Sequence, residues 1–245
     1  MNEKNITLKW HKPCELEDLD NFFKKEGKGL GGLYLWIFKG KPERIWYIGE
    51  AQNFKARFKK HLEYVTHGLY TAVKCATDED LCDKYKEISE NSDKAEQEGC
   101  FYKPKNDNFK RETLQEYVDR DAREKYVEKA KKGIQLNLDI FLNCYFVFVE
   151  TKCTAASRQE VESIFMHKRK VEYLEHIKKK YRRDCEINQA FLGTVSKKHD
   201  ENCQYIFTNT FSDPDTRLKI KKILKDIGIE LKGKGDVWTF PEEAE

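Results

Sequence analysis

The sequence lacks long apolar segments, an export signal and an abundance of chain-breaking residues. No apolar run approaches the roughly 18–20 residues that a bilayer-spanning helix needs, so we expect no membrane partner. The first ten residues, MNEKNITLKW, contain no apolar core of a signal peptide, which predicts a cytoplasmic protein. Only 5 Pro and 13 Gly interrupt the chain, while 15 Phe, 12 Tyr and 4 Trp supply a core, so the chain is not disordered.

The sequence also lacks any Cys-x-x-Cys pair, although it contains eight cysteines. Because no export signal is present, we expect reduced thiols rather than disulfides. The alternative is a zinc site formed by Cys185, His199 and Cys203, but their spacing matches no common zinc motif.

The near-zero net charge of +3 hides strong segregation of charge along the chain. Residues 77–99 hold nine acidic residues and three Lys, whereas residues 168–183 hold eight Lys or Arg and two Glu. Residues 55–61, KARFKKH, are basic without an acid. A single basic run is typical of a solvated helix face, but several runs around one motif favour phosphate binding.

Hydrophobic patterning predicts a hairpin followed by a helix in the first third of the chain. The apolar runs at 33–38 and 44–48 flank a Gly-Lys-Pro-Glu turn, which indicates two paired strands. A helix is then expected from an N-cap at Asn53 to Tyr64, and a shorter one at 15–26.

Further elements are expected towards the C-terminus. An aromatic strand is predicted at 140–149, followed by a helix over 157–183 whose apolar stripe includes Val161, Phe165 and Val171. Helices are predicted at 78–90 and 110–132. The tail should form a strand at 204–208, a helix at 215–227 and a strand at 236–240.

Two Gly- and Tyr-containing triplets fall into this order of elements. Gly32-Leu33-Tyr34 lies on the first strand of the hairpin and Tyr47-Ile48-Gly49 on the second. Arg57 follows on the next helix, and His61 lies one turn later on the same face. This pattern resembles the GIY-YIG nuclease family, over residues 30–65 and 140–190.

The resemblance implies an α+β fold with a small three-stranded sheet flanked by helices. We expect an N-terminal extension at 1–29 and a nuclease core at 30–193 that carries a helical insertion at 66–139. A small β-α-β appendage at 194–245, with a basic helix, would contact DNA.

The resemblance also implies a catalytic set. In the family a glutamate on the helix after the third strand binds the divalent metal. Glu162, with apolar residues three and four positions later, fits this pattern better than Glu160 does. An asparagine usually follows, for which Asn188 is preferred over Asn143 and Asn209. The implied catalytic residues are Tyr34, Tyr47, Arg57, His61, Glu162 and Asn188.

The residue types suit phosphodiester hydrolysis on chemical grounds. A carboxylate can hold Mg²⁺ or Mn²⁺, because these cations take oxygen ligands and keep several waters. An arginine fork matches phosphate oxygens, and a tyrosine or histidine can relay a proton. Taken singly, each residue also suits a structural role, such as a core tyrosine or a salt bridge from Glu162 to Arg158. The expected DNA-binding residues are Lys55, Lys59, Lys60, Lys168, Arg169, Lys178, Lys179 and Arg182.

The expected function is therefore metal-dependent cleavage of double-stranded DNA by a restriction-type endonuclease, a class that often acts as a homodimer. Two alternatives stay open: a non-catalytic nucleic-acid binder on the same scaffold, and an RNA-processing nuclease.

Overall fold

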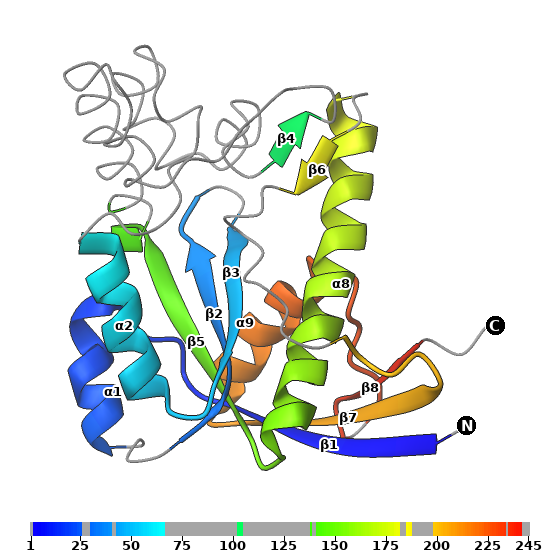
Figure 1. Cartoon of the computed structure of the whole chain (residues 1–245), viewed down its shortest axis with the longest axis horizontal. Coiled ribbons are helices and arrows are strands. Elements are labelled where there is room, and N and C mark those ends of the chain that lie inside the picture. The colour runs from blue at the N-terminus through cyan, green and yellow to red at the C-terminus, as the bar shows by residue number, and fades with distance from the viewer. Residues whose placement is uncertain are drawn as a thin grey trace, which may run out of the picture.

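The computed structural model describes residues 2–25, 30–40, 43–66, 102–104, 138, 141–181, 185–187, 198–233 and 235–241. Its centre is a mixed six-stranded sheet with the order β3-β2-β5-β1-β7-β8 (Figure 1). All neighbouring strands are antiparallel except β1 and β7, which are parallel. The strands are β1 (Asn2–Trp10), β2 (Gly32–Phe38), β3 (Arg44–Ala51), β5 (Cys144–Thr151), β7 (Cys203–Phe211) and β8 (Val237–Phe240).

The structure confirms the α+β class but corrects the expected three-stranded sheet. The expected strands β3, β2 and β5 are present, and β1 continues the sheet beyond β5. Strand β1 buries Ile6, Leu8 and Trp10 in alternation with more exposed residues, as a strand with one covered face does. Since β7 pairs with β1, the tail extends the central sheet instead of forming a separate small unit.

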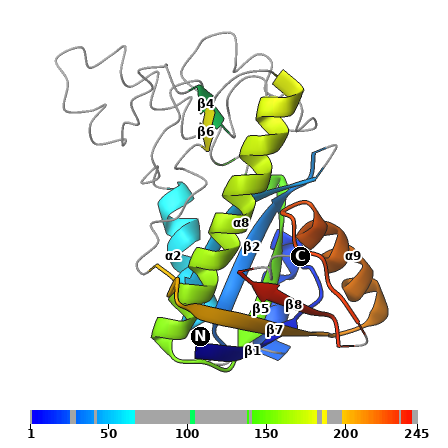
Figure 2. The ribbon, with the colours of Figure 1, turned by 90° about the vertical axis from the view of Figure 1, so that its right-hand side faces the viewer.

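Helices cover both faces of the sheet (Figure 2). Helices α1 (Leu19–Lys25) and α2 (Phe54–Thr66) pack on the face that carries Phe146 and Phe148. Helices α8 (Ala155–Tyr181) and α9 (Pro214–Lys225) cover the opposite face. There Phe165 contacts Trp10, and the Lys219 ammonium lies 3.8 Å from the ring centroid of Tyr145.

Two short strands, β4 (Tyr102–Pro104) and β6 (Cys185–Ile187), form a second, antiparallel sheet. Helix α8 contacts β6 near its C-terminal end (Figure 1). The helices expected at 78–90 and 110–132 lie outside the described residues.

Most element predictions for the described part are confirmed, including the hairpin and the long helix. Asn53 caps α2, because its Oδ1 accepts a hydrogen bond from the amide of Ala56 at 2.9 Å. The strand expected from residue 140 begins only at Cys144, since Phe141 and Leu142 are helical. The apolar stripe expected on α8 is also wrong at Val171, which is 45% exposed.

Candidate active site

A cavity of about 670 Å³ opens at the edge strand β3, where α2 from one face of the sheet approaches α8 from the other. Three of the predicted catalytic residues line it: Tyr47 from β3, Arg57 from α2 and Glu162 from α8. The other lining residues are Glu50, Ala51, Gln52, Asn53, Ala56, Lys60 and Gln159. The fold therefore gathers residues that lie more than a hundred positions apart in the sequence.

Tyr34 and His61 lie directly behind the cavity wall. The Tyr34 hydroxyl is 2.5 Å from Nε2 of His61, and Arg57 Nε donates a hydrogen bond to the same hydroxyl at 3.1 Å. The ring of Tyr47 stacks beside that of Tyr34, with centroids 5.8 Å apart. Tyr34 and His61 are each only 2% exposed, and they contact the lining residues Arg57 and Tyr47.

His61 is neutral at physiological pH. Burial lowers the pKa of His61 to about 3, and the positive charges of Arg57 and Lys60 lower it as well. When Nδ1 carries the single ring proton, Nε2 accepts the Tyr34 proton while Tyr34 accepts from Arg57. Burial also raises the pKa of Tyr34 well above its usual value and raises that of Tyr47. Both phenols are therefore protonated donors at neutral pH.

Both glycines of the triplets lie where the fold leaves no room for a side chain. Gly49 is paired with Tyr34 across the hairpin, and a Cβ atom at residue 49 would overlap with the phenolic oxygen of Tyr34. Gly32 has a φ of 151°, and a Cβ atom there would overlap with the carbonyl oxygen of Val149. Glycine is thus required at both positions by space or by conformation.

Glu162 and Glu160, the two candidates for the metal ligand, lie in different environments. Glu160 accepts hydrogen bonds from Lys4 at 2.7 Å and Tyr205 at 3.3 Å, away from the cavity. Glu162 lines the cavity, is 5% exposed, and has no ion pair with any other described residue. Burial raises the pKa of Glu162 to about 7, and the neighbouring carboxylate of Glu50 contributes to the increase.

Glu50 and Gln159 line the cavity, and Arg158 contacts Glu50, but none of the three was predicted as a functional residue. Arg158 is one helical turn before Glu162, which suggested an ion pair between them. In the structure Arg158 pairs with Glu50 instead, with Nε 3.4 Å from Oε2. A signal for Glu50 was present in the sequence, since it directly follows the Tyr-Ile-Gly triplet on the strand that ends at the cavity.

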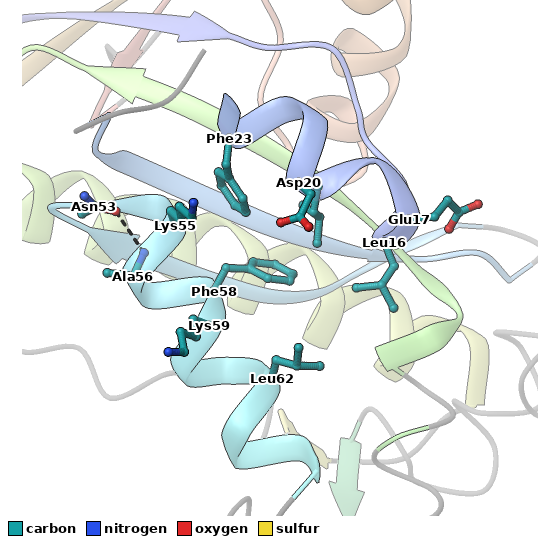
Figure 3. Close-up of a pocket in the computed structure, with 11 residues that line it drawn as sticks. Leu16, Glu17, Asp20, Phe23, Asn53, Lys55, Ala56, Phe58, Lys59 and Leu62 are labelled. Atoms are coloured by element: carbon teal, nitrogen blue, oxygen red, sulfur yellow. Dashed lines mark hydrogen bonds between the residues drawn. The ribbon is translucent and has the colours of Figure 1, made fainter. Parts of the chain in front are cut away.

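Those of the predicted DNA-binding residues that the structure describes do not form one surface. Lys60 lines the cavity, whereas Lys55 and Lys59 line a second cavity of about 650 Å³ on the other side of α2 (Figure 3). That second cavity has an apolar floor with Phe23 and Phe58, and its opposite rim carries Glu17 and Asp20 from the α1 side.

The structure corrects the prediction for Arg169, which is fully buried and does not lie on a DNA-accessible surface. Arg169 is seven residues, or two helical turns, after Glu162, so it continues the buried face of α8. Lys179 is exposed and Lys168 is half-buried. The side chain of Lys178, together with Arg182 and Asn188, lies outside the described residues.

Asn209, one of the alternatives for the catalytic asparagine, is buried and hydrogen-bonded within the fold. Its Oδ1 accepts from the Trp10 indole at 2.8 Å, and its Nδ2 donates to the carbonyl of Asp236 at 2.6 Å. Asn143 precedes β5, where its carbonyl accepts from the Lys39 amide at 2.9 Å. Neither residue lines the cavity at β3.

The two carboxylates at the cavity, Glu50 and Glu162, suit a cation that needs few ligands from the protein. Within the described ranges no group of three or more His, Cys, Asp or Glu residues could hold a metal ion. The zinc alternative is not tested by this, because the side chain of Cys185 lies outside the described part. Glu162 and Glu50 nevertheless present carboxylates to one cavity. Mg²⁺ is commonly bound by one or two carboxylates, with water and substrate phosphate completing its shell.

None of the helices in the described part is long and apolar enough to cross a membrane. Comparison of the chain with protein-family models, curated proteins and solved structures found no match. The interpretation of the site therefore depends on its residues and their geometry.

Proposed function

We propose that this protein is a metal-dependent endonuclease of the GIY-YIG type that hydrolyses phosphodiester bonds in DNA. The observation that carries the proposal is the shared cavity of Tyr47, Arg57 and Glu162, which come from β3, α2 and α8. A phenol, a guanidinium and a carboxylate supply the three kinds of group that phosphodiester hydrolysis requires.

The chemistry can be divided among the residues by their positions. Arg57 lines the cavity, and its guanidinium binds the non-bridging oxygens of the scissile phosphate. The hydrogen bond to Tyr34 at 3.1 Å orients Arg57 for this task, and His61 in turn orients Tyr34. Lys60, at the rim, adds positive charge next to the phosphate.

Tyr47, rather than Tyr34, is the tyrosine that meets the substrate, because it lines the cavity while Tyr34 is behind it. Its hydroxyl positions the attacking water. Glu162 would hold Mg²⁺ or Mn²⁺, and the bound cation would stabilise the charge that develops on the phosphate and the leaving oxygen. The pKa of Glu162, raised to about 7 by burial, is compatible with a carboxylate whose ionised form needs a cation beside it.

Cleavage of supercoiled plasmid in the presence of Mg²⁺ tests this proposal. We expect the wild type to cut, and Glu162→Gln and Arg57→Ala to reduce cutting at least about a hundredfold, because each removes a group that touches the reacting phosphate. Glu160→Gln is the matched control: it lies two residues away on the same helix, is equally buried, and lies outside the cavity, so it should keep its activity. Cutting by Glu162→Gln at the wild-type rate would reject the assigned metal ligand.

The products of the same reaction distinguish the finer possibilities. Discrete fragments indicate a site-specific, restriction-type enzyme, and a smear indicates a nonspecific nuclease. Mg²⁺-insensitive DNA binding without strand scission would instead identify a non-catalytic binder. Preferential cleavage of RNA under the same conditions would identify an RNA-processing enzyme.

A further inference from the structure

A second carboxylate, that of Glu50, meets Glu162 at the cavity. Glu50 is the penultimate residue of β3 and is paired with Leu33, which places it on the α8 side of the sheet, opposite to Tyr47. Its side chain lines the cavity and is 23% exposed. The two acids therefore come from different elements that converge at the edge of the sheet.

Arg158 neutralises Glu50 only weakly. The contact is a single one, 3.4 Å from Arg158 Nε to Glu50 Oε2, at the long end of the hydrogen-bonding range. The guanidinium is divided between two partners, because Nη1 donates to the carbonyl of Cys153 at 3.1 Å. A bidentate arginine–carboxylate pair, the geometry that gives a strong interaction, is not formed.

Glu162 has no cationic side chain paired with it among the described residues, although it is 95% buried and faces the cavity. After burial, the negative charge of Glu50 contributes most to the raised pKa of Glu162, while the backbone amide of Glu50 and the charge of Arg57 lower that pKa. Two carboxylates in a partly buried space are unfavourable unless a cation joins them. A divalent cation with hard oxygen ligands is the group that relieves this repulsion.

We propose that Glu50 is a second carboxylate ligand of the divalent cation held by Glu162, and that Arg158 is the counter-ion that Glu50 releases when the cation binds. The inference rests on the proposed function and adds a ligand to it. It gives the two halves of the Glu50–Arg158 ion pair opposite effects on cation affinity. Glu50 supplies a ligand, whereas Arg158 competes with the cation for that ligand.

Binding of Mn²⁺ alone to the full chain, measured by calorimetry without DNA, tests the proposal. We expect Glu50→Gln to weaken binding about tenfold and Glu162→Gln to weaken it at least as much. Arg158→Gln should bind Mn²⁺ as tightly as the wild type or several-fold more tightly, because the competing cation is gone. In ¹⁷O-labelled water, the electron paramagnetic resonance spectrum of bound Mn²⁺ should indicate one more water ligand in Glu50→Gln than in the wild type.

Each contrary result has a distinct meaning. Equal weakening by Glu50→Gln and Arg158→Gln would show that the pair only supports the structure, and would overturn the proposal. Unchanged binding by Glu50→Gln with loss in Glu162→Gln would reject Glu50 as a ligand and leave the proposed nuclease site standing. A wild type that does not bind Mn²⁺ at millimolar concentration would reject both. If Glu50→Gln fails to fold by circular dichroism, Arg158→Gln decides: weaker binding in this variant overturns the proposal.

Discussion

The phenolic oxygen of Tyr34 occupies the space where a side chain at Gly49 would begin. The two residues are paired across the β2–β3 hairpin, so the ring of Tyr34 crosses the neighbouring strand at its only glycine. This crossing brings the Tyr34 hydroxyl to His61 and Arg57. The glycine of the Tyr-Ile-Gly triplet is therefore needed for Tyr34, the tyrosine of the Gly-Leu-Tyr triplet, to take its position.

We expect Gly49→Ala to displace Tyr34 and to disrupt its hydrogen bonds with His61 and Arg57. Overpacking of a buried site costs about 1–3 kcal/mol of unfolding free energy, and DNA cleavage should fall along with it. Chemical denaturation and plasmid cleavage measure the two effects. The milder control is Gly235→Ala, where a new Cβ would lie 3.2 Å from a Val237 methyl, a tight contact that a small shift of this side chain relieves. Wild-type stability and activity in Gly49→Ala would contradict the close approach.

The sequence predicted local elements well because local signals determine them. The two apolar runs and the turn between them predicted the hairpin, and Asn53 marked the start of α2. The pairing of β1 between β5 and β7 was missed, although Ile6, Leu8 and Trp10 alternate as strand residues do. Parallel pairing with a strand some two hundred residues away leaves no local mark in either segment.

The same limit applies to the site. The sequence placed Tyr47, Arg57 and Glu162 in one site, and the three residues line one cavity, whereas Glu160 does not. Their catalytic roles stay predictions. The pairing of Arg158 with Glu50 depends on how α8 approaches β3, which helical spacing alone does not predict. Arg169 was misassigned because its charge suggested exposure, whereas its position on the buried helix face decided its environment.

The buried His61 should make the protein sensitive to acid. Its folded pKa of about 3 lies below the ordinary value of 6.5, so between these values the unfolded chain binds a proton that the folded chain does not. Stability from this residue is complete above pH 6.5 and is lost as the pH falls towards 3. At pH 4.5 the difference amounts to about 3 kcal/mol, from two pH units at 1.36 kcal/mol each.

The measurement compares the unfolding free energy of the wild type and His61→Gln at pH 7.5 and 4.5. We expect the wild type to lose about 3 kcal/mol more than the variant does over this interval. Glu162 titrates in the same interval but is present in both proteins, so its contribution cancels in the comparison. Equal losses in the two proteins would show that His61 is not buried in its neutral form.

The lysines of α2 should differ in their effect on DNA binding. Lys60 lines the cavity at β3, whereas Lys55 and Lys59 face the second cavity on the other side of the helix (Figure 3). We expect Lys60→Ala to weaken DNA binding several-fold and to reduce the salt dependence by about one phosphate contact. Fluorescence anisotropy in a series of salt concentrations measures both. If Lys55→Ala and Lys59→Ala weaken DNA binding as much as Lys60→Ala does, the DNA also contacts the face of α2 that borders the second cavity.

Asn209 should contribute to stability and not to catalysis. It is 5% exposed and connects β7 to Trp10 on β1 and to the carbonyl of Asp236 just before β8. Removal of its side chain leaves a buried indole N–H and a buried carbonyl without their partner. Each such group costs about 1–3 kcal/mol, so Asn209→Ala should lose about 2–6 kcal/mol of unfolding free energy.

Cleavage activity per folded molecule separates this role from a catalytic one. At a temperature where Asn209→Ala is folded by circular dichroism, its cleavage rate should equal that of the wild type, because the residue lies outside the cavity at β3. Asn209→Asp keeps the acceptor for Trp10 but sets a buried carboxylate oxygen against the carbonyl of Asp236, so its loss of stability should be at least as large as that of Asn209→Ala. The exposed Asn202 offers a control substitution of the same type, Asn202→Ala, with little expected effect. A folded Asn209→Ala protein that does not cut DNA would make Asn209 the asparagine of the catalytic set and would require the sheet around β7 to take part in the reaction.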